Sequence, residues 1–205
     1  MKSICVFGAS ITSGLNDFQE AGWCERMKKF LMPQGYLVSN LGIIGESSTD
    51  LLHRMEGECI TRKPDLILIS IGCNDSQFLL DSQKMRVEKD ETVRNFELLI
   101  GMAKKFTPQV VVVGLTQIDE ERINPIFSVE KHKIYHNDTL VEYNNAIQTV
   151  VESCKVPFIP TLDLLEMSDL DDGLHPNSRG HEKLFVTVVE HLERFQLIEL
   201  TKSPF

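Results

Sequence analysis

Short apolar runs alternate with amphipathic stretches along almost the whole chain, and this alternation limits the possible folds more than any other feature. A continuous apolar run is typical of a parallel strand buried on both faces, whereas apolar residues at helical spacing indicate a helix. The predicted strands are Ile4–Phe7, Tyr36–Asn40, Leu66–Ile71, Val110–Leu115 and Pro157–Ile159. The predicted helices are Asp17–Met32, Thr92–Lys105, Thr139–Ser153 and Ser178–Gln196. This order predicts an α/β fold, a three-layer α/β/α sandwich around a parallel sheet.

The 205 residues contain no Pro/Gly/Ser-rich linker, so we expect a single domain over residues 1–205. No stretch approaches the roughly 20 apolar residues needed to cross a bilayer, and the N-terminus has no cleavage site of a secretory signal. The cysteines are odd in number and form no CxxC pair, as is typical of free thiols in a reducing compartment. They are Cys5, Cys24, Cys59, Cys73 and Cys154. We therefore expect a cytoplasmic protein without a membrane span.

The net charge of −9 argues against a nucleic-acid partner, because phosphate backbones bind to basic surfaces. His132-x-x-x-His136 lacks the intervening Glu of the HExxH motif and fits a loop surface. Neither GxGxxG nor GxxxxGK(S/T) follows the first predicted strand, which argues against a nucleotide-binding doubly wound domain. We expect no metal and no cofactor, and the sequence leaves the oligomeric state, including a homo-oligomer, open.

Polar residues and glycines gather at three predicted strand ends, where ligands bind in parallel sheets. The three segments are Gly8–Thr12, Asn40–Gly45 and Gly72–Asp75. Ser10 directly follows the first strand, and Gly8 and Gly14 permit a tight turn around it. The chain has no GxSxG nucleophile elbow, and Ser10 taken alone fits a helix cap as well as a nucleophile.

A turn near the C-terminus supplies a base for such a serine. Asp172 and His175 are separated by Gly-Leu, so a turn can bring the carboxylate to the imidazole Nδ1 and leave Nε2 free for a serine. A turn with a helix cap at Asn177 or Ser178 is the simpler interpretation, and the two are compatible. Together with Ser10, these residues form a candidate catalytic triad.

Four segments in this order resemble the blocks of the SGNH (GDSL-like) hydrolase superfamily, and they span nearly the whole chain. The segments are Phe7–Thr12, Asn40–Gly45, Gly72–Asp75 and Asp172–Pro176. The resemblance implies a flavodoxin-like sheet. It also implies that Ser10 is the nucleophile, that His175 is the general base and that Asp172 orients the histidine.

The same resemblance implies an oxyanion hole. Its donors would be the backbone N–H of Ser10, the backbone N–H of Gly45 and the side chain of Asn74. Gly42 is the rival of Gly45, but the Asn-x-x-x-x-Gly spacing from Asn40 favours Gly45.

The implied activity is that of a serine esterase acting on a small-molecule carboxylic ester with an O-acetyl or another short acyl group. Thioesterase and lysophospholipase activities on the same site stay open, because loops recognise the leaving group. The superfamily usually has Asp before the nucleophile, where this chain has Ala9. That carboxylate braces the nucleophile loop, so a catalytically weakened binding module of the same fold is a further alternative.

Two segments with poor periodicity are expected to overhang the strand ends and to determine specificity. They are Ser76–Glu91, with Phe78, Leu79 and Leu80 as an apolar wall, and Gln117–Asp138, with Arg122, Phe127 and Tyr135 as a cation and two rings. Loop packing alone is the alternative for each of these side chains. The acidic run that starts at Asp119 favours a neutral ester or an acetylated sugar over a polyanion.

Overall fold

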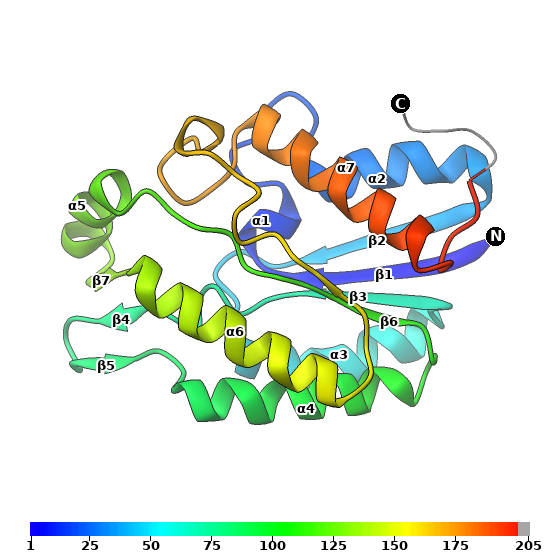
Figure 1. Cartoon of the computed structure of the whole chain (residues 1–205), viewed down its shortest axis with the longest axis horizontal. Coiled ribbons are helices and arrows are strands. Elements are labelled where there is room, and N and C mark those ends of the chain that lie inside the picture. Colours follow the sequence, from blue (N-terminus) through cyan, green and yellow to red (C-terminus); the bar gives the residue numbers. More distant parts are fainter. Residues whose placement is uncertain (201–205) are drawn as a thin grey trace.

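A five-stranded parallel sheet forms the centre of the computed structural model, which describes residues 1–200 (Figure 1). The strands lie in the order β2, β1, β3, β6, β8. Their bounds are β1 Lys2–Gly8, β2 Tyr36–Gly42, β3 Leu66–Ser70, β6 Val110–Val113 and β8 Phe158–Ile159. Each of the predicted strands belongs to this sheet, and helices lie on both of its faces. The predicted α/β/α sandwich is therefore confirmed.

Different helices cover the two faces of the sheet (Figure 1). The helices on one face are α2 (Gly22–Leu31) and α7 (Ser178–Arg194), and those on the other are α3 (Ser48–Arg62), α4 (Lys89–Lys104) and α6 (Asn137–Ser153). Along β1, Ile4 and Val6 belong to the apolar core under α2 and α7, whereas Cys5 and Phe7 belong to the core under the other three helices. Burial on both faces makes the strand a continuous apolar run, which is why the sequence predicts it.

The helix predicted over Asp17–Met32 is wrong in its first part. The Asp17 carboxylate accepts hydrogen bonds from the backbone N–H groups of Gln19, Glu20 and Gly22, so the chain turns here before α2 begins. Aspartate commonly closes such turns by bonding to the backbone that follows it. At the other end, the chain leaves α2 through a short 3₁₀ turn over Met32–Gln34.

The two segments with poor periodicity contain regular elements. Helix α5 (Glu120–Glu130) lies in one of them, and a small antiparallel sheet of order β5, β4, β7 joins both. Its strands are β4 Phe78–Leu79, β5 Lys84–Met85 and β7 Lys133–Ile134. The sequence also did not predict α3, the four-residue helix α1 (Ser10–Ser13) or a 3₁₀ turn over Met167–Asp169. Strands of two residues are too short for an alternating pattern to identify them.

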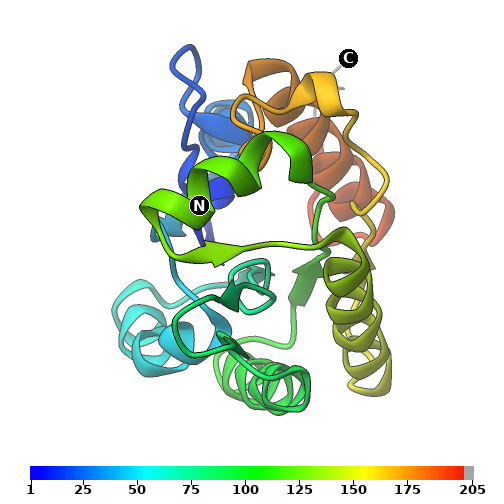
Figure 2. The same cartoon turned by 90° about the vertical axis from the view of Figure 1, so that its left-hand side faces the viewer.

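The carboxyl edge of the main sheet is the end of the molecule where these additional elements gather. Helix α1, helix α5 and the small sheet lie beyond this edge, which faces the viewer in Figure 2. The edge at which the sequence predicts the site is therefore partly covered by segments 76–91 and 117–138.

Within residues 1–200, no helix is both long and apolar enough to cross a membrane.

Candidate active site

Ser10 lies in a tight turn between the end of β1 and the short helix α1. A Cβ atom on Gly8 would come within 2.6 Å of the Ser70 carbonyl oxygen, so only glycine fits where the turn passes β3. The backbone N–H of Ser13 donates to the Ala9 carbonyl at 2.9 Å, and the Ser13 hydroxyl donates to the Ser10 carbonyl at 2.8 Å. These contacts hold Ser10 at the carboxyl edge, where 8% of the residue is exposed.

The predicted carboxylate, the predicted base and this serine form a series of hydrogen bonds. His175 Nε2 is 3.0 Å from Ser10 Oγ, and His175 Nδ1 is 2.6 Å from Asp172 Oδ2. The other carboxylate oxygen of Asp172 accepts the backbone N–H groups of Leu174 at 2.9 Å and of His175 at 2.7 Å. Gly173 has a φ of 96°, which glycine adopts without strain, so the turn from Asp172 to His175 can close on itself.

The turn holds Asp172 in its ionised form. Burial opposes ionisation, but hydrogen bonds from the side chain and backbone of His175 outweigh it and lower the pKa of Asp172 to about 2. The Asn16 side-chain amide adds a hydrogen bond to Asp172 at 3.2 Å from 156 residues away, a contact that no local pattern could predict. An ionised Asp172 favours the proton on His175 Nδ1 and leaves Nε2 as the acceptor that faces Ser10. This arrangement can take a proton from the serine hydroxyl.

The two candidate glycines of the oxyanion hole have different surroundings. The Gly42 N–H donates to the Asn40 side-chain oxygen at 3.1 Å, and a Cβ on Gly42 would come within 2.4 Å of the Ser13 nitrogen. Gly42 therefore allows β2 to pack closely against the Ser10 turn. The Gly45 N–H has no acceptor within residues 1–200, and its φ of 83° turns the chain after β2. Of the two, Gly45 has the free donor.

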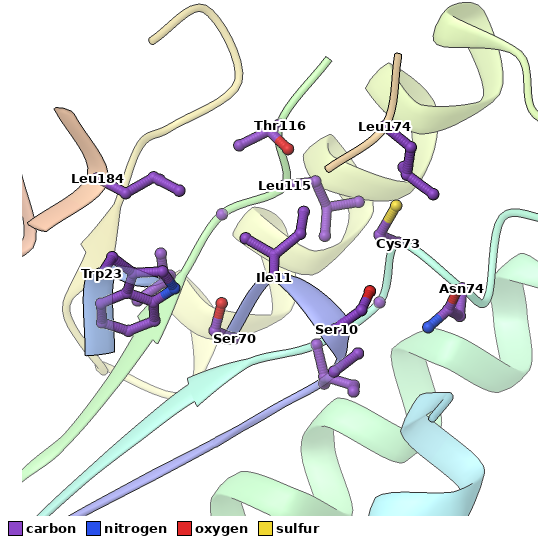
Figure 3. Close-up of a pocket in the computed structure, with 15 residues that line it drawn as sticks. Ser10, Ile11, Trp23, Ser70, Cys73, Asn74, Leu115, Thr116, Leu174 and Leu184 are labelled. Atoms are coloured by element: carbon purple, nitrogen blue, oxygen red, sulfur yellow. The ribbon is translucent and has the colours of Figure 1, made fainter. Parts of the chain in front are cut away.

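Asn74 lies just beyond β3, on the same side of the site as Gly45. Its Nδ2 donates to the Glu46 carbonyl at 2.8 Å, which ties the Asn74 amide to the residue next to Gly45. An amide nitrogen carries two hydrogens, so one remains for a ligand. In Figure 3 the amide nitrogen of Asn74 points toward Ser10. The structure thus brings all five predicted site residues to one edge of the sheet.

Asp75 is a site-supporting residue that the sequence analysis missed, although it directly follows Asn74. It is fully buried and accepts the Ser48 backbone N–H at 2.8 Å, the Ser48 hydroxyl, and the Thr92 hydroxyl at 3.0 Å. Burial raises the pKa of Asp75, and these hydrogen bonds oppose that rise only in part. Because Ser48 begins α3, Asp75 joins the segment that carries Asn74 to the helix after β2.

A cavity of about 40 Å³ lies beside Ser10 (Figure 3). Its wall is mostly apolar, with Ile11 in the middle of the view and with Trp23 and Leu184 at the end opposite to Asn74. The cavity is small and adjoins the serine directly. Its volume favours a small group bound to Ser10.

The side chains expected to recognise the substrate lie elsewhere or have other contacts. Phe78–Leu80 do not line this cavity. Arg122 donates to two backbone carbonyls just before the His-Asp turn. Tyr135 is buried and donates its hydroxyl hydrogen to Asn74 Oδ1. The centroid of its ring lies 6.0 Å from the centroid of the Phe127 ring. Segment 117–138 therefore contacts a residue of the site, Asn74, and does not only overhang the strand ends.

A serine, a histidine and a carboxylate at the carboxyl edge of an α/β sheet are typical of ester hydrolases. Comparison with known proteins agrees with this class, because residues 6–183 match the GDSL-like Lipase/Acylhydrolase family. The chain belongs to this family and is an ester-hydrolysing enzyme.

Two relatives and one solved structure illustrate the similarity. A multidomain esterase of Ruminococcus flavefaciens is 29% identical over 170 residues, which are 78% of this chain and 20% of that protein, so the chain spans only a fifth of it. An acetylxylan esterase of Geobacillus stearothermophilus is 27% identical over 158 residues, which are 72% of this chain and 68% of that protein. The crystal structure of a lipase/acylhydrolase from Enterococcus faecalis is 23% identical, covers 99% of this chain and 100% of its own, and superimposes with a TM-score of 0.79. This last likeness concerns the fold.

Proposed function

We propose that the chain is a serine esterase for short acyl esters, in which Ser10 attacks the acyl carbonyl. The observation that carries the proposal is the continuous hydrogen-bond chain from Asp172 through His175 to Ser10, with lengths of 2.6 and 3.0 Å. Both lengths lie within the range over which a positioned base removes a proton. This intact series of hydrogen bonds argues against the alternative of an inactive binding module.

The proposed mechanism uses only side chains and backbone groups of this chain. His175 Nε2 takes the Ser10 proton as Oγ attacks, and the ionised Asp172 stabilises the imidazolium. The oxyanion then accepts hydrogen bonds from the backbone N–H groups of Ser10 and Gly45 and from Asn74 Nδ2. The imidazolium protonates the leaving alcohol, and an acyl group remains on Ser10. Water, deprotonated in turn by His175, releases the acid.

The cavity beside Ser10 supports a short acyl group. A single water needs roughly 10–15 Å³ of such space, so about 40 Å³ holds roughly three non-hydrogen atoms. An acetyl group, with three non-hydrogen atoms, matches this volume, whereas the long chain of a lysophospholipid exceeds it. The relative from Geobacillus stearothermophilus carries the name acetylxylan esterase, which favours an acetylated sugar as the substrate class.

A panel of p-nitrophenyl esters from acetate to octanoate tests the proposal, with acetylated xylo-oligosaccharides and an acetyl thioester as further substrates. We expect kcat/KM to be highest for acetate or propionate and to fall at least about tenfold by octanoate, because the cavity is full after a short chain. A higher value for octanoate would contradict the short-acyl assignment. A higher value for the thioester would identify a thioesterase. Absence of turnover on every substrate by the folded protein would favour the binding module.

A further inference from the structure

Two buried donors enclose the side-chain oxygen of Asn74. The Tyr135 hydroxyl lies 2.9 Å from Asn74 Oδ1, and Gln77 Nε2 lies 2.6 Å from the same atom. Gln77 Nε2 also donates to the Tyr135 oxygen at 2.5 Å. Tyr135 and Gln77 are each only 1% exposed. Neither residue has a part in the proposed triad, yet both contact the proposed oxyanion donor.

These contacts decide which end of the Asn74 amide faces Ser10. The oxygen and nitrogen of an amide have nearly the same size but opposite hydrogen-bonding roles, so packing alone does not distinguish the two orientations. With Oδ1 held by Tyr135 and Gln77, Nδ2 faces the Glu46 carbonyl and the Ser10 side. In the flipped orientation, Oδ1 would face both the Glu46 carbonyl and the oxyanion, and Nδ2 would face two donors.

The orientation of Gln77 is fixed in turn by an arginine. The Arg86 guanidinium donates to Gln77 Oε1 at 3.3 Å and to the Asp50 carboxylate at 2.9 Å. Arginine has only donors, so the oxygen of Gln77 must face Arg86 and its nitrogen must face Asn74. Burial raises the pKa of Tyr135 well above its ordinary value, so its hydroxyl keeps the proton that it donates. The donor and acceptor roles of the linked side chains are thereby fixed, from Asp50 by way of Arg86 and Gln77 to Asn74.

The small antiparallel sheet brings Tyr135 to Asn74. Strand β4 starts directly after Gln77, strand β7 ends directly before Tyr135, and the two strands pair. The side chain of Asn124, in α5, holds both polar groups of the Tyr135 backbone. Its oxygen accepts the Tyr135 N–H at 2.9 Å, and its nitrogen donates to the Tyr135 carbonyl at 2.7 Å. The additional elements beyond the sheet edge therefore position one hydroxyl group with several independent contacts.

We infer that Tyr135 is a positioning residue of the oxyanion hole, which acts with Gln77 to hold the amide nitrogen of Asn74 toward the reacting carbonyl. The inference rests on the proposed function, in which Asn74 stabilises the oxyanion. An oxyanion donor contributes mainly in the transition state, so a misoriented Asn74 lowers kcat and leaves KM nearly unchanged.

Tyr135→Phe tests the inference because it removes the hydroxyl and keeps the ring. We expect kcat for p-nitrophenyl acetate to fall about tenfold and KM to change less than about twofold. Tyr143→Phe is the matched control, since Tyr143 is also buried and donates its hydroxyl to the Val87 carbonyl at 2.6 Å, outside the proposed machinery. The control should keep the kcat of the wild type, and thermal melts check that both variants are folded.

A double-mutant cycle with Asn74→Ala separates positioning from a general structural role. In the Asn74→Ala background, Tyr135→Phe should change kcat less than about twofold, because the amide that it orients is gone. A loss in Tyr135→Phe no larger than that in Tyr143→Phe would overturn the inference, and so would equal losses in both backgrounds. If Asn74→Ala alone leaves kcat unchanged, the oxyanion role itself fails and the positioning role falls with it. Gln77→Met should give the same kcat loss and the same dependence on Asn74, and it replaces Tyr135→Phe if that variant does not fold.

Discussion

The two halves of the proposed active site draw their parts from very different distances along the chain. The His-Asp half lies within the single turn Asp172–His175, whose own backbone N–H groups hold the carboxylate. The oxyanion half joins Asn74 to Glu46 and to Tyr135, which is 61 residues away. A closed turn depends mostly on its own residues, whereas the orientation of the Asn74 amide depends on the assembled fold. We therefore expect the effects of substitutions in the two halves to differ in size and in how far they depend on the surrounding residues.

The largest effect is expected in the local half, from Asp172→Asn. The variant keeps the size of the side chain but removes the charge that favours the proton on His175 Nδ1. We expect kcat to fall about 10³–10⁴-fold with little change in Tm, as measured by steady-state kinetics and thermal melts. Asp171→Asn is the control, because Asp171 is exposed and adjacent, and it should match the wild type. A large drop in Tm for Asp172→Asn alone would mean that the turn needs the charge to form.

The next effect is expected in the oxyanion half, from Asn74→Ala. Loss of one oxyanion donor should lower kcat about 10²–10³-fold and leave KM within about threefold. The measurement is a full kinetic curve with p-nitrophenyl acetate, with Asn145→Ala on the exposed side of α6 as the control. A rise in KM at constant kcat would instead assign Asn74 to ground-state binding. It would contradict the role of Asn74 in an oxyanion half of the site.

A third prediction concerns a long-range contact of the helix that follows the His-Asp turn. His181 of α7 is buried, accepts the Trp23 N–H at Nδ1 and faces the Leu15 carbonyl with Nε2, so it ties the helix after His175 to the Ser10 loop. Burial lowers the pKa of His181 from 6.5 to about 4. The unfolded chain therefore binds this proton more readily than the folded protein does.

The stability contributed by a neutral His181 is complete above pH 6.5 and is lost as the pH falls toward 4. The loss should approach about 3 kcal/mol in the free energy of unfolding. Denaturant unfolding at pH 7 and pH 4 measures it, and His181→Gln should show a drop that is smaller by about this amount. An identical pH dependence in the variant would show that His181 is not the group that titrates.

The smallest effect is expected from Ala9→Asp, which restores the usual carboxylate before the nucleophile. Backbone hydrogen bonds from Ser13 to Ala9 and from Ile43 to Gly8 already hold this loop, so we expect kcat to rise less than about threefold. Ala9→Asn separates the effect of charge from that of size. A rise of tenfold or more would show that the natural loop positions Ser10 poorly, and a fall in Tm would show that the site cannot accommodate the carboxylate.

The same contrast in distance explains what the sequence could and could not predict. Buried strands such as β1 are continuous apolar runs, and the turn that carries His175 contains its own partner, so both follow from local sequence. Helix α3 also had a signal that the sequence analysis missed, since Leu51, Met55 and Cys59 are four residues apart and all buried. The contact of Tyr135 with Asn74 had no local signal, because it exists only once two-residue strands have paired.

The most direct test of the central claim is the site of covalent labelling by a fluorophosphonate, mapped by peptide mass spectrometry. Such probes react with a serine only when a base and an oxyanion hole activate it. The account predicts one adduct, on Ser10, that is absent in Ser10→Ala while Ser82→Ala, on the exposed surface, labels like the wild type. An adduct on Ser13, Ser47 or Ser48, or labelling of Ser10→Ala equal to that of the wild type, would contradict it.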